Sequence, residues 1–369
     1  MVDRLYINNY KSLVDFELTN IPNFCVFAGA NGTGKSNIFE ALQFLAMSVA
    51  YVGSGYDKPN TIEDSEEAIE NYFLSSVYDA FGGIECFLNK RIAKSEIIKP
   101  TNKRPKIEIT LLVEQNTIGL QYLFYAKSNG DTFIGAISHE GTDFWEYPPD
   151  ENERAKRIKA HTEFQVGFNR LFVDKSNVVR SKNTGNIKLS PDASNLGKVL
   201  DRILQNSEIK EEVLNWLSLL IPEFENIKIE KGLDGDSKFY IKEKHTETWF
   251  SADLISDGTK AILALLTVVY QSDEPQFICI EEPENGLNPY VQKQMVEFFR
   301  LACENFGHTI WLNTHSQTIV KELEPQELVL IDKVEGRTIA KQFSSNYNMH
   351  GLDMDQAWLS NALGGGVPW

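Results

Sequence analysis

Cysteine is scarce in this chain of 369 residues. Its four cysteines are Cys25, Cys86, Cys279 and Cys303, which lie far apart and form no C-x-x-C pair. Neither a disulfide framework nor a zinc ribbon fits that spacing. We therefore expect the cysteines to behave as small buried hydrophobic residues.

Long hydrophobic runs are also missing. The mean hydropathy is −0.29, and no apolar stretch comes near the ~18 residues that a membrane-spanning helix needs. The N-terminus, Met1-Val2-Asp3-Arg4, carries charge where a secretory signal would be apolar. The sequence argues against a membrane protein and predicts a cytoplasmic location.

Basic residues are fewer than acidic residues. The chain has 36 Lys and Arg against 52 Asp and Glu, a formal net charge of −16, which argues against a protein that coats nucleic acid with its whole surface. Residues 90–188 nevertheless hold 17 basic against 12 acidic residues. This region is either an insertion that binds nucleic acid or an acidic partner, or a solvated, loop-rich surface. Its densest basic stretch comprises Lys90, Arg91, Lys94, Lys99, Lys103, Arg104 and Lys106.

Hydrophobic periodicity predicts an α/β chain with an insertion. The predicted strands and hairpins cover residues 5–28, 106–125, 133–137, 144–145, 227–241, 277–280, 309–312 and 329–331. The predicted helices cover residues 37–45, 148–163, 195–224 with a break at Asn206-Ser207, 260–269 and 289–305.

The strongest motif follows the buried run Phe24–Ala28. The next eight residues, Gly29–Ser36, fit G-x-x-x-x-G-K-[ST] in the strand–loop–helix setting that this pattern requires. Backbone N–H groups of such a loop and the positive end of the next helix cradle phosphates, while the lysine and serine reach the phosphates and Mg²⁺. The candidate ATP-binding residues are Asn31, Gly32, Thr33, Gly34, Lys35, Ser36 and Asn37, with Ser36 also a candidate Mg²⁺ ligand.

A second motif is the apolar run Phe277–Ile280, which ends in two carboxylates. Beside a phosphate-binding loop, Glu281 is expected at Mg²⁺, acting through water, and Glu282 is expected to orient and deprotonate the attacking water. Both assignments depend on the phosphate-binding loop earlier in the chain. Without such a loop, two adjacent glutamates after a strand are usually solvent-exposed residues at the strand end.

Two further motifs suggest a composite site. Ser256-Asp257-Gly258-Thr259 opens an apolar helix and forms a second anion site. Because one chain offers no second triphosphate, we expect Ser256 and Gly258 to cap the γ-phosphate of another copy, which makes ATP the link in a head-to-tail homodimer. His315, after the strand ending at Leu312, is placed to contact the γ-phosphate.

Together these motifs resemble the ABC-type ATPase heads of the SMC, RecF and OLD-like group, specifically stand-alone prokaryotic AAA family ATPases found beside anti-phage systems. The segments that carry the resemblance are Asn8–Leu13, Gly29–Asn37, Ser256–Thr259, Ile280–Pro289 and Thr314–Ser316. The resemblance implies an α/β P-loop NTPase fold of ABC-ATPase type, with a mixed central sheet, an antiparallel β subdomain and a helical lobe. It also implies ATP and Mg²⁺ as ligands.

The resemblance assigns roles to single residues. By it, Ser256 and Gly258 belong to the signature motif, Glu282 is the catalytic base and His315 is the switch histidine. Residues 284–288 are the dimer-spanning D-loop, although Asn288 stands where His is common. The glutamine that should follow the first lobe is either Gln115 or Gln121, and Lys11 is a candidate for contact with the nucleotide.

The predicted organisation is a single ABC-type ATPase domain over residues 1–369. Residues 1–50 and 245–340 form the nucleotide-binding core, residues 51–244 the inserted β-hairpin and helical lobes, and residues 341–369 a C-terminal tail. The 219 residues between Ser36 and Ser256 lack sustained heptads, which argues against a long coiled coil. Since 54 residues follow His315, we expect any nuclease activity to come from a partner.

The function expected is ATP hydrolysis by a homodimeric head that controls a separately encoded effector, a nuclease or toxin, in anti-phage defence. One alternative is a RecF-like DNA-repair ATPase, which the basic region 90–188 would suit. Another is a nucleotide-locked scaffold with little turnover. Salt-dependent DNA binding and single-turnover hydrolysis distinguish them.

Overall fold

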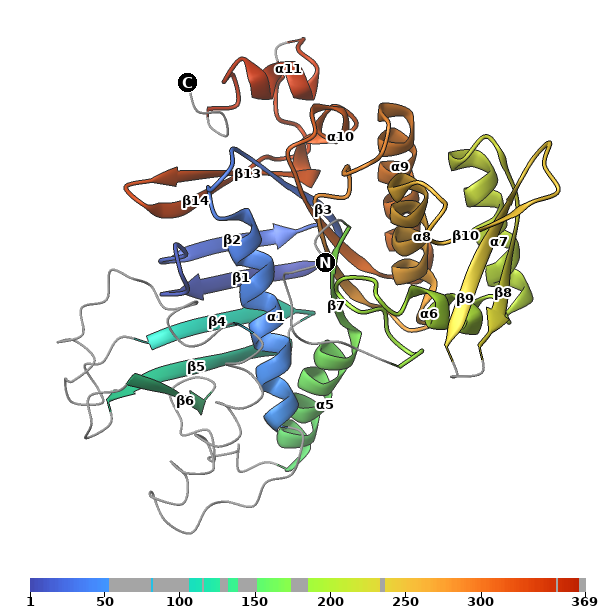
Figure 1. The fold of residues 1–369 in the computed structure, drawn as a ribbon. Coiled ribbons are helices and arrows are strands. Elements are labelled where there is room, and N and C mark those ends of the chain that lie inside the picture. The colour runs from blue at the N-terminus through green and yellow to red at the C-terminus, as the bar shows by residue number, and fades with distance from the viewer. Residues whose placement is uncertain are drawn as a thin grey trace. The chain divides into compact units, whose positions relative to one another are not determined.

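The computed structural model describes residues 1–52, 81, 106–114, 116–126, 132–138, 151–173, 185–232, 236–349 and 351–364. These fall into two compact units (Figure 1). Unit 1 comprises Met1–Phe168 and Glu324–Trp369, and unit 2 comprises Asn169–Leu323. The predicted division into core, inserted lobes and tail stays a prediction, and it does not follow the boundary between the units.

Unit 1 is built on strands. Its helices are α1 (Lys35–Val52), α5 (Glu151–Gly167), the 3₁₀ turn η4 (Pro325–Glu327) and α11 (Met354–Leu359). Its strands are β1 (Val2–Asn8), β2 (Phe16–Ile21), β3 (Phe24–Ala28), β4 (Lys106–Val113), β5 (Asn116–Ala126), β6 (Thr132–Ser138), β13 (Leu328–Val334) and β14 (Arg337–Gln342).

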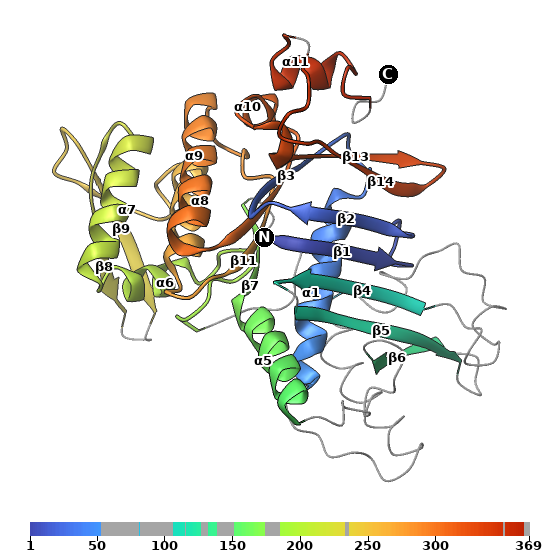
Figure 2. The same ribbon diagram turned by 180° about the vertical axis from the view of Figure 1, so that it is seen from behind.

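The larger sheet of unit 1 is antiparallel, in the order β2-β1-β4-β5-β6. In Figure 1 α1 runs in front of it, and from behind, in Figure 2, the sheet lies in front of α1. One face is therefore covered by the helix. The strands show the corresponding alternation, since Leu5 and Ile7 on β1 and Ile107 and Ile109 on β4 are fully buried.

The second sheet of unit 1 carries the phosphate-loop motif. All five residues of β3 are buried, as expected of a strand covered on both faces. Strand β13 pairs with β3 in parallel, with Leu328 opposite Val26, and β14 pairs with β13 antiparallel. The arrangement is therefore mixed, as predicted.

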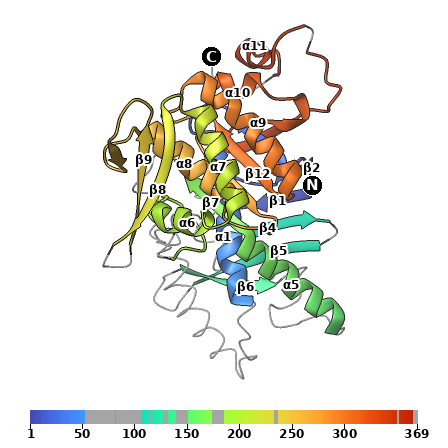
Figure 3. The ribbon, with the colours of Figure 1, turned by 90° about the vertical axis from the view of Figure 1, so that its right-hand side faces the viewer.

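Unit 2 alternates strands and helices. Its helices are α6 (Leu196–Ile203), α7 (Ser207–Leu220), α8 (Asp257–Tyr270), α9 (Pro289–Phe306) and α10 (Gln317–Lys321). Its strands are β7 (Phe168–Phe172), β8 (Phe224–Lys231), β9 (Ser237–Glu243), β10 (Trp249–Ser251), β11 (Phe277–Glu281) and β12 (Thr309–Thr314). Strand β11 lies between β7 and β12 and is parallel to β12. Strands β8 to β10 form an antiparallel sheet, visible in Figure 3 beside α6 and α7.

Helix boundaries in unit 2 follow local capping chemistry. The side chains of Asn206, Ser256 and Asn288 accept hydrogen bonds from the first turns of α7, α8 and α9, which satisfies amides that a helix leaves unpaired. Pro289 occupies the first turn of α9, and Gly307 ends that helix in a left-handed conformation with φ 69°.

Most predicted elements are confirmed within a few residues at their ends. The predicted break at Asn206 separates α6 from α7. Strands β7, β10 and β14, helices α10 and α11 and the 3₁₀ turn η4 were not predicted, and the expected strand at 144–145 lies outside the described residues. Cys25, Cys279 and Cys303 are buried free thiols, while Cys86 is outside the described part. In the part of the chain that the structure describes, no helix is both long and apolar enough to cross a membrane.

Candidate nucleotide site

The predicted phosphate loop connects β3 to α1. Gly32 and Gly34 have φ values of 77° and 105°, which L-residues with a Cβ rarely adopt. A Cβ on Gly34 would lie 2.1 Å from the Thr338 hydroxyl, and one on Gly29 would lie 2.1 Å from the Ile331 carbonyl oxygen. The motif glycines therefore let β13 and β14 pack directly against the loop.

The motif lysine lies inside this loop. Lys35 Nζ donates hydrogen bonds to the carbonyl oxygens of Gly29 and Ala30, both at 2.8 Å, and the residue is buried. Asn31 and Gly32 are exposed at the tip, whereas Ser36 is half-buried in the first turn of α1. The partners of the Lys35 ammonium are thus neutral carbonyl oxygens. An anionic phosphate can replace them, because it accepts a stronger hydrogen bond from an ammonium group.

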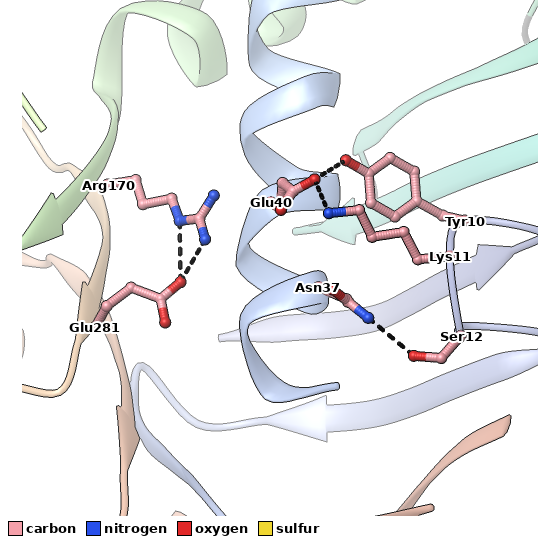
Figure 4. A network of polar contacts seen from close by, with 7 residues as sticks. All are labelled: Tyr10, Lys11, Ser12, Asn37, Glu40, Arg170 and Glu281. Carbon is pink, nitrogen blue, oxygen red and sulfur yellow. Dashed lines mark hydrogen bonds and ion pairs between the residues drawn. The ribbon is translucent and has the colours of Figure 1, made fainter. Parts of the chain in front are cut away.

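A chain of hydroxyl and amide groups braces the loop. Asn37 Nδ2 donates to Ser12 Oγ at 2.9 Å (Figure 4). Ser12 Oγ lies 2.7 Å from Thr338 Oγ1, and Thr338 Oγ1 donates to the Thr33 carbonyl at 2.7 Å. Because the single proton of the Thr338 hydroxyl is used on Thr33, Ser12 donates to Thr338. The backbone N–H of Thr338 also donates to the Ser12 carbonyl, at 2.9 Å. Ser12 therefore bonds directly to Asn37 and, through Thr338 on β14, is linked to Thr33 in the loop.

The neighbouring motif residues contact α1. Lys11 Nζ forms an ion pair with Glu40 Oε1 at 2.5 Å, and the Tyr10 hydroxyl donates to the same oxygen at 3.0 Å (Figure 4). Lys11 has a positive φ of 48°. Its predicted contact with the nucleotide stays a prediction, and in this structure its ammonium is engaged by Glu40.

In unit 2, Glu281 ends β11 as a buried carboxylate. Arg170 on β7 donates to its Oε1 from Nε at 3.0 Å and from Nη2 at 2.5 Å (Figure 4). Asn313 Nδ2 donates to Oε2 at 2.5 Å. The side chains of Arg170 and Glu281 are 4% and 3% exposed. Sequence reasoning missed Arg170 and Asn313; the signal for Arg170 was a charge inside the short apolar run Phe168–Phe172.

Glu282 differs from its neighbour. Its backbone has a positive φ of 49°, and its N–H donates to the Asn313 carbonyl at 2.8 Å. Its half-buried carboxylate accepts a hydrogen bond from Asn285 Nδ2 at 3.1 Å. The turn in the backbone thus separates a buried, charge-paired Glu281 from a more accessible Glu282, which is the arrangement expected for one fixed carboxylate and one base.

The residues present fit Mg²⁺ only in a limited way. A carboxylate has about four lone-pair sites, and N–H groups of Arg170 and Asn313 occupy three of those on Glu281, so that contact through water fits better than direct coordination. The Ser36 hydroxyl is a suitable oxygen donor. Among the residues searched, no group of three or more His, Cys, Asp and Glu gathers into a metal cluster.

The signature residues lie at the start of α8. Ser256 is exposed and caps the helix, accepting from the Thr259 N–H at 3.1 Å. A Cβ on Gly258 would lie 2.5 Å from the Gly286 carbonyl oxygen. The signature motif and the predicted D-loop therefore touch within unit 2. Asn288, which departs from the family pattern, serves as the N-cap of α9.

His315 follows the end of β12. Its backbone N–H donates to Glu284 Oε1 at 2.8 Å, so it lies next to the turn that carries Glu282. Gln115 and the whole of the basic stretch from Lys90 to Arg104 lie outside the described residues, as does the side chain of Gln121.

Residues 24–321 match the model of a protein family described as "AAA domain, putative AbiEii toxin, Type IV TA system". The chain belongs to this family. The match runs from β3 through α10, and so it includes the phosphate loop, the signature residues, Glu281-Glu282 and His315.

Two curated relatives carry ATP-related descriptions. An "ATP/GTP phosphatase" from Helicobacter pylori (strain ATCC 700392 / 26695) is 21% identical over 354 residues, covering 88% of each chain. An "Energy-coupling factor transporter ATP-binding protein EcfA2" from Lactobacillus johnsonii is 40% identical over 57 residues, 15% of this chain and 19% of that protein. The matched segments span about a fifth to a third of the length of the transporter proteins.

Solved structures show the fold. A structure of the "SmcHead bound to the C-winged helix domain of ScpA" has a TM-score of 0.53 and 13% identity, covering 93% of this chain and 98% of that one. A second, an Smc head domain with an extended coiled coil bound to the C-terminal domain of ScpA derived from Pyrococcus furiosus, has a TM-score of 0.51 and 13% identity over 93% and 96%. The predicted P-loop ATPase fold is confirmed.

Proposed function

We propose that this chain binds ATP at Gly29–Ser36 and hydrolyses it with Glu282 as the general base. The observation that carries the proposal is the braced phosphate loop, in which Gly29 and Gly34 leave no room for a side chain and Lys35 is held by neutral carbonyls. The order of motifs along the chain, together with the family match, supports the assignment of Glu282.

Each residue has a defined task in this proposal. The loop amides and Lys35 bind the phosphates, and Glu282 orients a water and accepts its proton. Ser36, and Glu281 through water, would hold Mg²⁺, which supplies charge neutralisation at the β- and γ-phosphates. Arg170 and Asn313 fix the orientation of the Glu281 carboxylate.

Glu282→Gln tests the chemistry. Gln keeps the shape of the side chain but does not accept a proton, so steady-state hydrolysis should fall by ~10²–10⁴ while ATP binding is retained. Glu335→Gln is a matched control, because Glu335 has the same φ of 49° and is exposed between β13 and β14. Full hydrolysis by Glu282→Gln would reject Glu282 as the base.

The proposal includes a homodimer in which Ser256 acts on the nucleotide of the other copy. The support is that Ser256 is exposed at the N-terminus of a 14-residue helix, where backbone amides attract anions. Ser256→Arg should then leave nucleotide binding intact and stop hydrolysis.

Mixing Ser256→Arg with Lys35→Ala chains tests action in trans. A heterodimer of these chains pairs intact Ser256 with intact Lys35 in one of its two sites, so partial recovery of hydrolysis is expected. A full rate from isolated Ser256→Arg would reject the assignment.

We further propose that the ATPase controls a separately encoded effector in defence against phage. The support is the description of the family, which names a putative toxin of a toxin–antitoxin system, and the resemblance of the motifs. Co-purification of the product of an adjacent reading frame, dependent on Mg-ATP, is the expected result. Its failure under both nucleotide-free and Mg-ATP conditions would contradict this part.

DNA binding is the second candidate, favoured by the basic excess in residues 90–188. Counterion release then predicts a steep loss of affinity between low and moderate salt. Reversing Lys103 and Arg104 to Glu should abolish DNA binding and leave ATP hydrolysis unchanged. Binding equal to wild type would identify the stretch as a solvated surface.

A further inference from the structure

Glu284 lies in a tight turn between β11 and α9. The turn is closed by hydrogen bonds from the Asn285 N–H to the Glu282 carbonyl at 3.1 Å and from the Leu287 N–H to the Glu284 carbonyl at 3.0 Å. Positive φ values at Glu282 and Gly286, 49° and 75°, reverse the chain. The side chain of Glu284 is therefore held at a fixed place relative to the backbone of Glu282.

From this turn Glu284 reaches the end of the neighbouring strand. Its Oε1 accepts the backbone N–H of His315 at 2.8 Å. The pKa of Glu284 is raised, mainly by burial, with the charge of Glu282 adding to the effect, while the His315 N–H acts in the opposite direction. This bond thus provides an acceptor for the N–H of His315, which lies directly after the end of β12.

A second bond holds the next residue to the same element. The Ser316 hydroxyl donates to Gln292 Oε1 at 2.6 Å, and Gln292 Nε2 donates to the Leu287 carbonyl at 2.8 Å. Ser316 Oγ also accepts the Ile319 N–H at 3.3 Å as the N-cap of α10. The backbone at residues 315 and 316 is consequently fixed by Glu284 on one side and by Gln292 on the other.

The opposite side of the turn rests on the signature motif. A Cβ on Gly258 would meet the Gly286 carbonyl at 2.5 Å, so this contact admits only glycine at position 258. The turn therefore contacts the start of α8 and, through Glu284, the segment that carries His315.

We propose that Glu284 is a positioning residue that fixes His315 relative to Glu282. This inference rests on the proposed function, in which Glu282 is the base, and on the expectation from the sequence that His315 contacts the γ-phosphate. The hydrogen bond from the His315 N–H requires an acceptor at this position and not a charge, so an uncharged acceptor of the same shape can replace Glu284. Glu284→Gln should therefore behave as wild type, whereas Glu284→Ala should not.

Amide hydrogen exchange resolved at His315 tests the contact without reference to hydrolysis. Glu284→Ala should speed exchange of the His315 N–H by about tenfold or more, as expected when a hydrogen bond to this amide is lost, and Glu284→Gln should leave it within about threefold of wild type. Exchange in Glu284→Ala equal to wild type would overturn the inference, whether or not the wild-type protein hydrolyses ATP.

Steady-state kinetics tests the consequence. Glu284→Ala should lower kcat by about tenfold or more and leave the Kd for Mg-ATP within about twofold, and Glu284→Gln should restore at least half of kcat.

Glu327→Ala is the control for this test. Glu327 Oε2 accepts the Glu324 N–H at 2.8 Å, which is a comparable carboxylate–amide bond in η4. Its loss should lower thermal stability without changing kcat. If Glu284→Gln is as impaired as Glu284→Ala, the charge and not the positioning is what matters, and the inference is wrong. A wild-type chain without hydrolysis would reject the proposed function alone, since the exchange result stands independently.

Discussion

Arg170 and Glu281 form a buried ion pair in which two guanidinium N–H groups converge on one carboxylate oxygen. The pair joins β7 to β11, and Asn313 on β12 completes it by donating to the second oxygen. Three adjacent strands are thus tied together at the strand end where the two carboxylates of the motif stand. These donors offset the cost of burying the carboxylate of Glu281 in the interior.

Removing Arg170 should destabilise the folded protein. Arg170→Met leaves the buried carboxylate of Glu281 without its cationic partner and should lower the free energy of unfolding by about 3–5 kcal/mol, measured by urea denaturation. The double variant Arg170→Met/Glu281→Gln should recover at least half of that loss. Lys293→Met, which breaks a pair with Glu322 whose side chains are 56% and 25% exposed, should cost less than about 1 kcal/mol. Equal stability of Arg170→Met and wild type would contradict the description of this pair.

Thr338 should control nucleotide affinity from outside the motif. Thr338→Val removes the hydroxyl that donates to the Thr33 carbonyl, leaves that buried carbonyl unpaired, and should weaken equilibrium ATP binding by about tenfold. Thr267→Val is the matched control, because the Thr267 hydroxyl makes a similar 2.6 Å bond to the Leu263 carbonyl within α8 and both residues are buried. Equal ATP affinity in the two variants would show that the hydrogen bond from Thr338 to Thr33 is not needed for ATP binding.

His308 should make stability depend on pH. Its Nδ1 accepts the Gln276 N–H at 3.1 Å, so the proton lies on Nε2, which donates to the Val269 carbonyl at 3.0 Å. Burial lowers the pKa of His308 below the ordinary 6.5. The unfolded chain therefore binds a proton more readily, and the contribution of the neutral ring, complete above pH 6.5, is lost as the pH falls through the folded pKa.

The change in unfolding free energy between pH 7.5 and pH 5 measures this contribution. His308→Asn, which retains an acceptor for the Gln276 N–H, should show a smaller decrease than wild type, with a difference in slope of at most about 1.4 kcal/mol per pH unit. His245→Gln, at an exposed position after β9, should keep the slope of wild type. An unchanged slope in His308→Asn would assign the pH dependence to other groups.

Local chemistry made much of the fold and site predictable. The glycine loop, the helix caps Asn206 and Ser256, and the apolar strand ending at Glu281 are each defined by a few consecutive residues, and the structure bears out the elements they predict. The roles of the site residues themselves stay predictions.

The partners of these residues were not predictable. Arg170 reads as one more charge in a basic region, and only the pairing of β7 with β11 makes it the counter-charge of Glu281. Thr338 lies 305 positions from the residue it braces. Such contacts depend on which strands become neighbours, and tertiary packing selects those neighbours across loops that carry no local signal.

Equilibrium binding of Mg-ATP to Lys35→Ala tests the central claim most directly. Lys35 is the single cationic side chain of the Gly29–Ser36 loop, so its removal should weaken ATP binding by about a hundredfold or more and abolish hydrolysis with it. Lys333→Ala, whose ammonium lies 3.3 Å from the Gly32 carbonyl on the outside of the loop, is the control and should bind ATP within about threefold of wild type. Tight Mg-ATP binding by a folded Lys35→Ala chain would show that this loop is not the nucleotide site.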